Sequence, residues 1–217
     1  NIMTGEGGVV VTEDEEIGRK LRLKRNHGET VMDSTDTLDR NRNVVGFNFR
    51  LTELAAELGN QQLGALHKLN TIRKVNYHYL VNGLTNCCGE IMVPQKIEDP
   101  DSYAPYHAGF RWLTEKSGVH RNVIAYILRE EGIPISTGFS RLMCDHPLFK
   151  QKAAYSLQQS RFDYQQVKIP NARRLFDEQY IGFSQVGWPN TIEDMGDIIR
   201  AFEKIVHNID RLRAERL

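Results

Sequence analysis

The first 50 residues of the chain alternate between short apolar runs and longer polar stretches. Three consecutive valines predict a buried strand over residues 7–12, because β-branched residues favour strands. Thr12 and Glu15 then have the spacing of a capping box, and an apolar stripe after them predicts a helix that ends near Gly28. Residues 29–45 are polar, so we expect a long loop there, and long loops in compact proteins are often functional.

The longest helical pattern in the sequence begins at Thr52. Apolar residues recur there at steps of three to five, which is typical of one face of an amphipathic helix. These residues are Leu54, Leu58, Leu63, Leu66, Leu69 and Ile72. We expect one long helix that runs to about Leu84 and connects a large domain to a small one.

Beyond this helix the pattern predicts alternating strands and helices. Strands are predicted over Tyr106–Leu113, Ile133–Ser136 and Tyr180–Phe183, and helices over Val119–Glu131 and Thr191–Arg213. The last helix has the clearest apolar stripe, and its first residue is a threonine followed by acids, which favours a helix start. The pattern therefore indicates an α/β or α+β protein with few strands.

Composition and charge narrow the class of function. The 217 residues include 28 basic and 28 acidic side chains, so no net field draws the chain to nucleic acid. No apolar run approaches the ~20 residues of a membrane-spanning helix. Cys87, Cys88 and Cys144 have the spacing of neither a zinc site nor a disulfide framework, which favours a reducing cytoplasm. We expect a cytoplasmic protein that binds neither nucleic acid nor membrane and holds no metal.

Two short segments are candidates for binding phosphate. Residues 4–8 are rich in glycine, but they match neither a Walker loop nor a dinucleotide fingerprint, and a tight turn explains them better. Asn48 and Arg50 precede the long helix in a stretch that alternates polar and aromatic residues. An amide and a guanidinium there suit a phosphate, and a strand edge with polar groups facing solvent explains them equally well. Three of the seven scattered histidines are interpreted as structural: His27, His107 and His146.

Two blocks of the sequence resemble one enzyme family. Residues 1–28 contain Thr-Gly-Glu-Gly-Gly, a valine run and Arg-Asn-His-Gly, in the order found after the catalytic lysine of the DegT/DnrJ/StrS family. Residues 46–50, Gly-Phe-Asn-Phe-Arg before an Ala-Ala helix, resemble the family's Gly-Tyr-Asn-x-Arg segment. Glu-Gly-Ile-Pro at residues 131–134 is a weaker match, and residues 135–140 depart from the His-Tyr loop of many sugar aminotransferases.

The resemblance implies an α/β protein of the fold type I class, whose members are transferases that depend on pyridoxal 5'-phosphate (PLP). The chain would hold the end of the large PLP-binding domain over residues 1–50 and a long connecting helix over residues 51–85. A small C-terminal α+β domain would follow over residues 86–217. The Schiff-base lysine would lie immediately before Asn1, so that this chain begins inside a domain and carries no catalytic residue itself.

The resemblance also implies a cofactor, a partner and a reaction. Asn48 matches the family position that reaches the PLP phosphate from the neighbouring subunit, with Arg50 beside it. A homodimer with shared active sites would follow. The reaction would be transfer of an amino group from glutamate or glutamine to a keto sugar linked to a nucleotide, with the electron chemistry supplied by the cofactor.

Two alternatives stay open from the sequence. Sugar dehydratases of the same family have histidine in place of the lysine, and the deciding residue precedes Asn1. The Arg-Asn-His-Gly block resembles the aminotransferase branch more closely. Alternatively, the chain is a catalytically silent fragment that keeps only a dimer surface.

Overall fold

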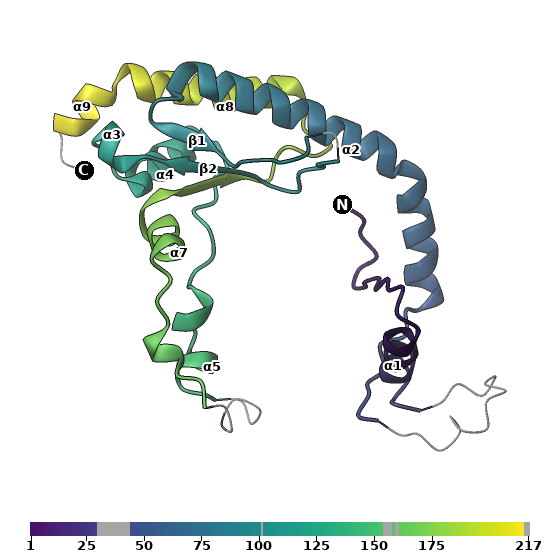
Figure 1. The fold of residues 1–217 in the computed structure, drawn as a ribbon. Coiled ribbons are helices and arrows are strands. Elements are labelled where there is room, and N and C mark those ends of the chain that lie inside the picture. The colour runs from purple at the N-terminus through teal and green to yellow at the C-terminus, as the bar shows by residue number, and fades with distance from the viewer. Residues whose placement is uncertain (30–43, 101, 154–157, 159–160, 215–217) are drawn as a thin grey trace. The chain divides into compact units, whose positions relative to one another are not determined.

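The computed structural model describes residues 1–29, 44–100, 102–153, 158 and 161–214. The chain divides into two compact units, Asn1–His67 and Lys68–Leu217. Helix α2 (Glu53–Cys88) begins in the first unit and ends in the second (Figure 1). The long helix that the sequence predicts from Thr52 is therefore confirmed, and it continues past Leu84. Most of the predicted loop over residues 29–45 lies outside the described residues.

The N-terminal unit is built around helix α1 (Glu15–Arg25). The cap of this helix is Asp14, whose carboxylate accepts a hydrogen bond from the Ile17 N–H at 2.9 Å. Thr12 lies outside the helix, and its hydroxyl accepts a hydrogen bond from the Asp14 N–H instead. The predicted capping box of Thr12 and Glu15 is therefore wrong, because an aspartate two residues later takes the capping position.

The predicted buried strand over residues 7–12 is also wrong. The three valines at 9, 10 and 11 expose 89%, 71% and 87% of their surface, and these residues form no strand. A β-branched run forms a strand only when a neighbouring strand accepts and donates its backbone hydrogen bonds. None of the described segments supplies such a neighbour here. The glycine-rich residues before it do form a bend, in which Gly5 has a φ of 79°.

The C-terminal unit contains an antiparallel sheet of three described strands. The strands are β1 (Met92–Pro94), β2 (Ala108–Trp112) and β3 (Tyr180–Phe183), and they lie in that order. Two of the three predicted strands are thereby confirmed. The third, predicted over Ile133–Ser136, is wrong: Ser136 alone forms an isolated bridge to β3.

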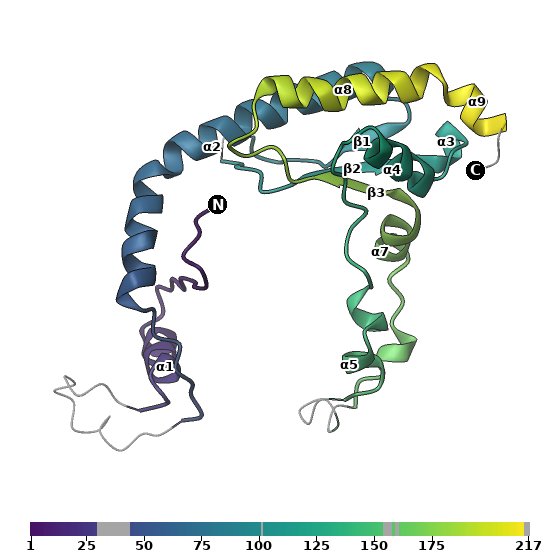
Figure 2. The ribbon, with the colours of Figure 1, turned by 180° about the vertical axis from the view of Figure 1, so that it is seen from behind.

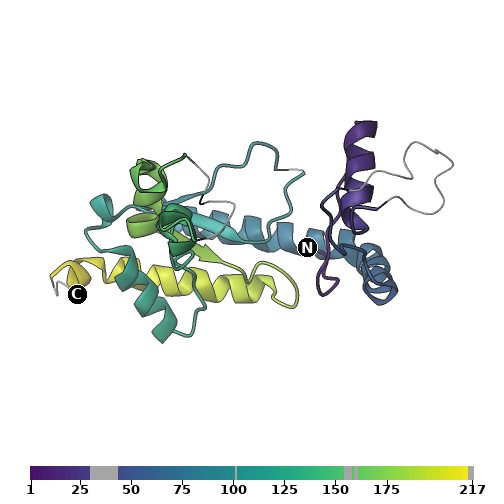
Figure 3. The ribbon, with the colours of Figure 1, turned by 90° about the horizontal axis from the view of Figure 1, so that it is seen from below.

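One face of the sheet packs on two helices. Helix α8 (Ile192–His207) lies alongside the second part of α2 over this face (Figures 1 and 3). The helices approach closely at Gly83, where a Cβ would lie 2.2 Å from Ile199 Cδ1. The core between helices and sheet is centred on large, fully buried side chains: Trp112, Phe183, Phe202, Leu80 and Leu84.

Two further predicted helices are recovered with different ends. The helix predicted over Val119–Glu131 is α4 (Arg121–Glu130), preceded by the short helix α3 (Thr114–Ser117). The helix predicted over Thr191–Arg213 is two helices, α8 and α9 (Ile209–Ala214), which meet at Asn208. Thr191 caps α8 as predicted, in a capping box with Asp194.

Residues 142–153 and 161–174 form an arm that extends away from the sheet (Figures 1 and 2). Its described part contains four short helices: η2 (Met143–Asp145), α5 (Pro147–Lys150), η3 (Tyr164–Gln166) and α7 (Pro170–Arg174). The arm rejoins the sheet through a π-helical turn, η4 (Leu175–Gln179), which leads directly into β3.

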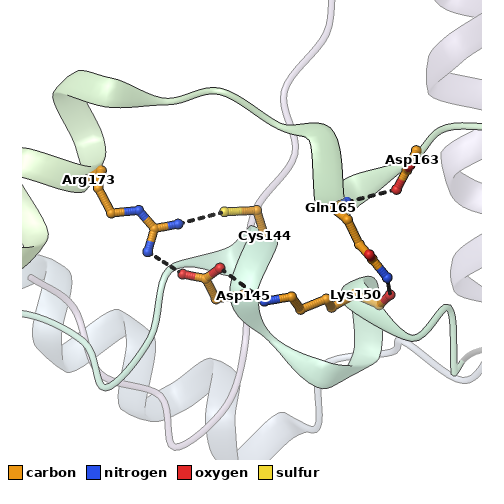
Figure 4. A network of polar contacts seen from close by, with 6 residues as sticks. All are labelled: Cys144, Asp145, Lys150, Asp163, Gln165 and Arg173. Carbon is orange, nitrogen blue, oxygen red and sulfur yellow. Dashed lines mark hydrogen bonds and ion pairs between the residues drawn. The ribbon is translucent and has the colours of Figure 1, made fainter.

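An ion-pair network ties the outgoing and returning halves of the arm together (Figure 4). The Asp145 carboxylate contacts Arg173 Nη1 at 2.5 Å and Lys150 Nζ at 3.8 Å. The hydrogen bond from Arg173 lowers the pKa of Asp145 below its usual value. Beside it, Gln165 Nε2 donates to the Lys150 carbonyl at 3.4 Å. The four described helices of the arm are thus joined by polar contacts across residues distant in the sequence.

Candidate functional site

The segment that carries Asn48 and Arg50 is held by the last turn of α1. The carbonyls of this turn have no partners within the helix and need donors from elsewhere. Lys24 and Arg25 accept hydrogen bonds there from the Phe47 and Phe49 N–H groups, both at 2.9 Å. In return the His27 N–H donates to the Phe47 carbonyl at 2.9 Å. Residues 44–50 therefore pair with the end of α1 instead of forming a free loop.

Two glycines make this close pairing possible. Gly28 has a φ of 79°, and a Cβ built on it would lie 1.6 Å from the Val44 carbonyl oxygen. A Cβ on Gly46 would lie 2.2 Å from the Gly28 nitrogen. Side chains at either position would push the two backbones apart. The helix stop predicted near Gly28 is confirmed. Gly28 also has a second role, which is to allow the close approach of the Val44 backbone.

The pairing places Asn48 and Arg50 together on the surface. Both are exposed, and Asn48 forms an isolated bridge with Asn26 at the end of α1. Arg50 Nη1 donates to Asn26 Oδ1 at 2.5 Å, and the Arg50 N–H faces Asn48 Oδ1 at 3.4 Å. Exposed polar side chains on a bridged segment agree with both interpretations, a phosphate-binding pair and a strand edge that faces solvent.

The donors of this pair suit a phosphate group. Among the described residues, Asn48 Nδ2 has no hydrogen-bond partner, and the Arg50 guanidinium has only Asn26. An amide N–H and a charged guanidinium are strong donors to phosphate oxygens. A neighbouring groove of about 680 Å³ between residues 8–12 and α1 adds further positive charge, since its lining includes Arg22, Lys24 and Arg25.

A second candidate site lies in the C-terminal unit, on the face of the sheet opposite the core. A cavity of about 520 Å³ is bounded there by the end of the loop before β2, the loop after α4, the arm and η4. This volume is in the range of small-molecule sites. The lining is mainly aromatic and apolar: Tyr106, His107, Ser136, Thr137, Gly138, Phe139, Leu142, Ala172, Leu175, Phe176 and Tyr180.

Glycines in the sheet leave room for two side chains that line this cavity. Gly109 and Gly182 lie opposite each other in β2 and β3, so the sheet presents no side chains at this point. His107 and Tyr180 occupy the space, with their rings stacked at 6.1 Å. A Cβ on Gly182 would lie 2.1 Å from His107 Nε2 and 2.5 Å from the Tyr180 hydroxyl.

The polar atoms of the cavity are sheltered from water. His107 Nε2 is buried without a hydrogen-bond partner among the described residues. Burial lowers the pKa of His107 and raises the pKa of Tyr180, because both charged forms are disfavoured there. His107 Nε2 lies against Gly182 in the sheet, so the cavity itself presents mainly aromatic and apolar surface.

Metal and membrane sites are not found in the parts of the chain that the structure describes. No group of three or more His, Cys, Asp or Glu side chains gathers there. No described helix is both long and apolar enough to cross a bilayer. Cys87, Cys88 and Cys144 are free cysteines in the structure.

Comparison with known proteins identifies the family. The model of the DegT/DnrJ/EryC1/StrS aminotransferase family matches residues 1–181, which is most of the chain. The chain belongs to the DegT/DnrJ/EryC1/StrS aminotransferase family. The resemblance that the two sequence blocks indicated is therefore confirmed.

Two curated relatives of this family member have different reactions in their names. One is a UDP-N-acetyl-3-dehydro-α-D-glucosamine 3-aminotransferase from Acidithiobacillus ferrooxidans, 32% identical over 59% of this chain and 31% of the relative. The other is a GDP-4-keto-6-deoxy-D-mannose 3-dehydratase from Escherichia coli, 30% identical over 64% of this chain and 38% of the relative. Relatives matched along nearly the whole chain are covered over about half of their own length, 51% and 52% in two cases.

Solved structures show the same fold. A putative sugar aminotransferase from Streptococcus pneumoniae in its PLP form matches with a TM-score of 0.61 and 22% identity. The match covers 93% of this chain and 46% of that one. The chain therefore has the fold of part of a fold type I, PLP-dependent transferase, as expected.

The sequence located one of the two candidate sites. Asn48 and Arg50 were singled out by their residue types and by the family pattern, and the structure presents them side by side. The cavity was missed, although His107 was noted as a structural histidine. Its lining comes from four segments separated by up to 74 positions, from Tyr106 to Tyr180. The signals available in the sequence were Gly109 and Gly182, since glycine inside a strand often marks a close approach.

Proposed function

We propose that the protein is a PLP-dependent aminotransferase that moves an amino group from glutamate or glutamine to a keto sugar linked to a nucleotide. The observation that carries this proposal is the pair of donors, Asn48 and Arg50, held at the end of α1 in a member of an aminotransferase family. The nucleotide-linked substrate is supported by the sugar named in the Acidithiobacillus ferrooxidans relative.

In this proposal the described residues bind and orient the cofactor. Asn48 Nδ2 and the Arg50 guanidinium donate hydrogen bonds to the PLP phosphate, while the contact from Arg50 to Asn26 keeps the guanidinium in place. PLP, when bound, supplies an electron sink for the bond that breaks at the α-carbon of the donor. By the family resemblance, the lysine that would hold PLP lies before Asn1.

We further propose that the enzyme is a cytoplasmic homodimer with shared active sites. Asn48 and Arg50 then reach the cofactor phosphate of the partner subunit, so that dimer formation and PLP binding depend on each other. Residues 1–50 complete the large domain, the helix over 51–85 connects the domains, and residues 86–217 form the small domain.

Variants of the donor pair test the phosphate site. Each charge-assisted hydrogen bond is worth about 1.5–3 kcal/mol, or roughly 10- to 150-fold in a dissociation constant. We expect Asn48→Ala and Arg50→Ala to weaken PLP binding by at least tenfold in a titration of the apoenzyme. Lys20→Ala is the control, because Lys20 is exposed and its ion pair is with Glu16 on the opposite end of α1. If Asn48→Ala and Arg50→Ala bind PLP as tightly as the Lys20→Ala control does, the proposed phosphate site is refuted.

An isotope experiment tests the reaction. The holoenzyme is incubated with ¹⁵N-labelled glutamate or glutamine and a keto sugar linked to UDP or GDP, and the sugar nucleotide is analysed by mass spectrometry. The proposal predicts that the sugar gains a ¹⁵N amino group. Loss of a hydroxyl without gain of ¹⁵N identifies the alternative, a sugar dehydratase, which the Escherichia coli relative supports.

A further inference from the structure

One buried arginine lies directly behind the walls of the aromatic cavity. Arg121 is the first residue of α4 and exposes only 5% of its surface. Its Nη1 donates to the carbonyls of Thr137 at 3.1 Å and Tyr180 at 2.8 Å. Its Nη2 donates to the carbonyls of Phe176 at 2.8 Å and Asp177 at 3.0 Å. All four acceptors are backbone atoms, and they belong to two separate segments, the loop after α4 and residues 176–180.

Both segments are walls of the cavity. Thr137 lies in the loop after α4, Phe176 and Asp177 lie in the π-helical turn η4, and Tyr180 begins β3. Thr137, Phe176 and Tyr180 also line the cavity themselves. One guanidinium therefore joins wall segments that approach the cavity from different directions.

The wall segments also have hydrogen bonds of their own. In η4 the Tyr180 N–H donates to the Leu175 carbonyl, and Tyr180 pairs with Arg111 in β2. The loop after α4 joins the sheet through one bridge, in which Ser136 and Gly182 exchange hydrogen bonds at 2.9 Å. Arg121 adds four hydrogen bonds that link the loop after α4 to residues 176–180, and burying its charge is tolerable because four carbonyls surround it.

The chemistry of the cavity indicates which substrate it suits. Its lining residues include no Asp, Glu, Lys or Arg, whereas glutamate, glutamine and phosphate groups carry charges. Tyr106 and Phe139 offer aromatic surface at the rim, where they are 72% and 90% exposed. Aromatic faces without charged groups suit a neutral ring. Such a ring is part of the acceptor and not of the amino donor.

We propose that Arg121 is a positioning residue that sets the shape of this cavity and, through it, the affinity for a neutral ring of the keto-sugar acceptor. Arg121 does not contact the acceptor. This inference rests on the proposed aminotransferase function.

The test compares substitutions of two arginines on the same helix in the holoenzyme. Arg121→Met removes all four hydrogen bonds. Arg121→Lys keeps the positive charge, but its single ammonium group replaces only some of the four hydrogen bonds. Arg129→Met is the matched control, because Arg129 is exposed and donates to one carbonyl, that of Ile135 at 3.3 Å. Steady-state kinetics then gives separate KM values for the acceptor and for the amino donor.

A second pair of variants tests the cavity without touching Arg121. Ala172 lines the cavity from an exposed position on α7, and Asn171 is exposed beside it but does not line the cavity. Ala172→Trp fills the cavity, and Asn171→Trp controls for a large side chain on the same short helix. If Arg121→Met does not fold, Arg121→Lys and this pair carry the test.

The expected result is a selective effect on the acceptor. The acceptor KM rises at least tenfold in Arg121→Met and in Ala172→Trp, and by a smaller factor in Arg121→Lys. The donor KM and kcat stay within threefold, and both controls stay within twofold of the wild type. A loss of thermal stability in Arg121→Met with an unchanged acceptor KM shows a purely structural role and overturns the inference. Absence of amino transfer by the wild type overturns the proposed function itself, and this inference with it.

Discussion

Replacing Gly28 by alanine should damage both stability and PLP binding. Gly28 has a left-handed φ of 79°, and its added Cβ would lie 1.6 Å from the Val44 carbonyl oxygen and 2.8 Å from the Val44 carbonyl carbon. Both of these atoms are backbone, so no side-chain rotation relieves the clash. The segment that starts at Val44 and carries Asn48 and Arg50 must move away from the end of α1.

The size of the effect follows from two contributions. The left-handed conformation costs a non-glycine residue about 1–2 kcal/mol. Moving Val44 breaks its hydrogen bond to the Gly28 carbonyl, 3.1 Å long, and weakens the pairing beyond it. Each lost hydrogen bond costs about 0.5–1.5 kcal/mol, so the total destabilisation should be about 2–4 kcal/mol. Gly5→Ala separates the contributions, because Gly5 has the same φ of 79° but nothing within 4 Å of its Cβ position.

The assay is denaturant unfolding of the holoenzyme together with a PLP titration of the apoenzyme. We expect Gly28→Ala to lose about 1–2 kcal/mol more than Gly5→Ala, the share of one or two hydrogen bonds. PLP affinity should fall at least tenfold in Gly28→Ala and stay within twofold of the wild type in Gly5→Ala. Equal losses of stability and unchanged PLP affinity in both variants would refute the reasoning that Gly28 positions the Asn48 segment.

Three further predictions concern the C-terminal unit. Phe202 is fully buried, so Phe202→Ala should cost about 3–5 kcal/mol in urea unfolding, whereas Phe162→Ala, 56% exposed, should cost far less. Arg173 lowers the pKa of Asp145, so its stabilisation is present above the ordinary carboxyl pKa and is lost as the pH falls through the lowered value. The melting temperature of Asp145→Asn should therefore fall less than that of the wild type as the pH is lowered below about 4. Burial raises the pKa of Tyr77 to about 12, so stability should fall as the pH rises from about 10 to 12, and Tyr77→Phe should remove part of that fall.

The periodic parts of the fold could be predicted from the sequence. Long apolar stripes located α2 and α8, because a helical face repeats its pattern over many turns. β3 was predicted with its observed ends, since Tyr-Ile-Gly-Phe has core residues at alternate positions. The three-residue strand β1 was missed, because so short a segment carries no measurable alternation.

The errors arose where the outcome depends on distant partners. The valines at 9–11 have a strong strand propensity but no neighbouring strand among the described residues, and they are exposed. Residues 133–136 look similar in sequence, yet only Ser136 meets β3. Helix α8 stops at Asn208 although the apolar stripe continues, because Asn208 takes the C-cap position and its side chain donates to the Lys204 carbonyl.

The two candidate sites also differ in whether a local sequence pattern suffices to find them. Asn48 and Arg50 lie two positions apart, so a local pattern and a family resemblance sufficed to find them. The cavity needs Arg121, His107, Thr137 and Tyr180 at once, and no local pattern brings these residues together. Tertiary structure is required to see that one buried guanidinium donates hydrogen bonds to two of its wall segments.

Borohydride reduction of the holoenzyme, followed by digestion and sequencing of the peptide that contains Asn1, tests most directly whether this chain belongs to a PLP-dependent aminotransferase. Reduction fixes PLP covalently to the side chain that holds it. We predict a pyridoxyl-lysine immediately before Asn1. Histidine at that position, or a lysine there without the adduct, would contradict an aminotransferase function.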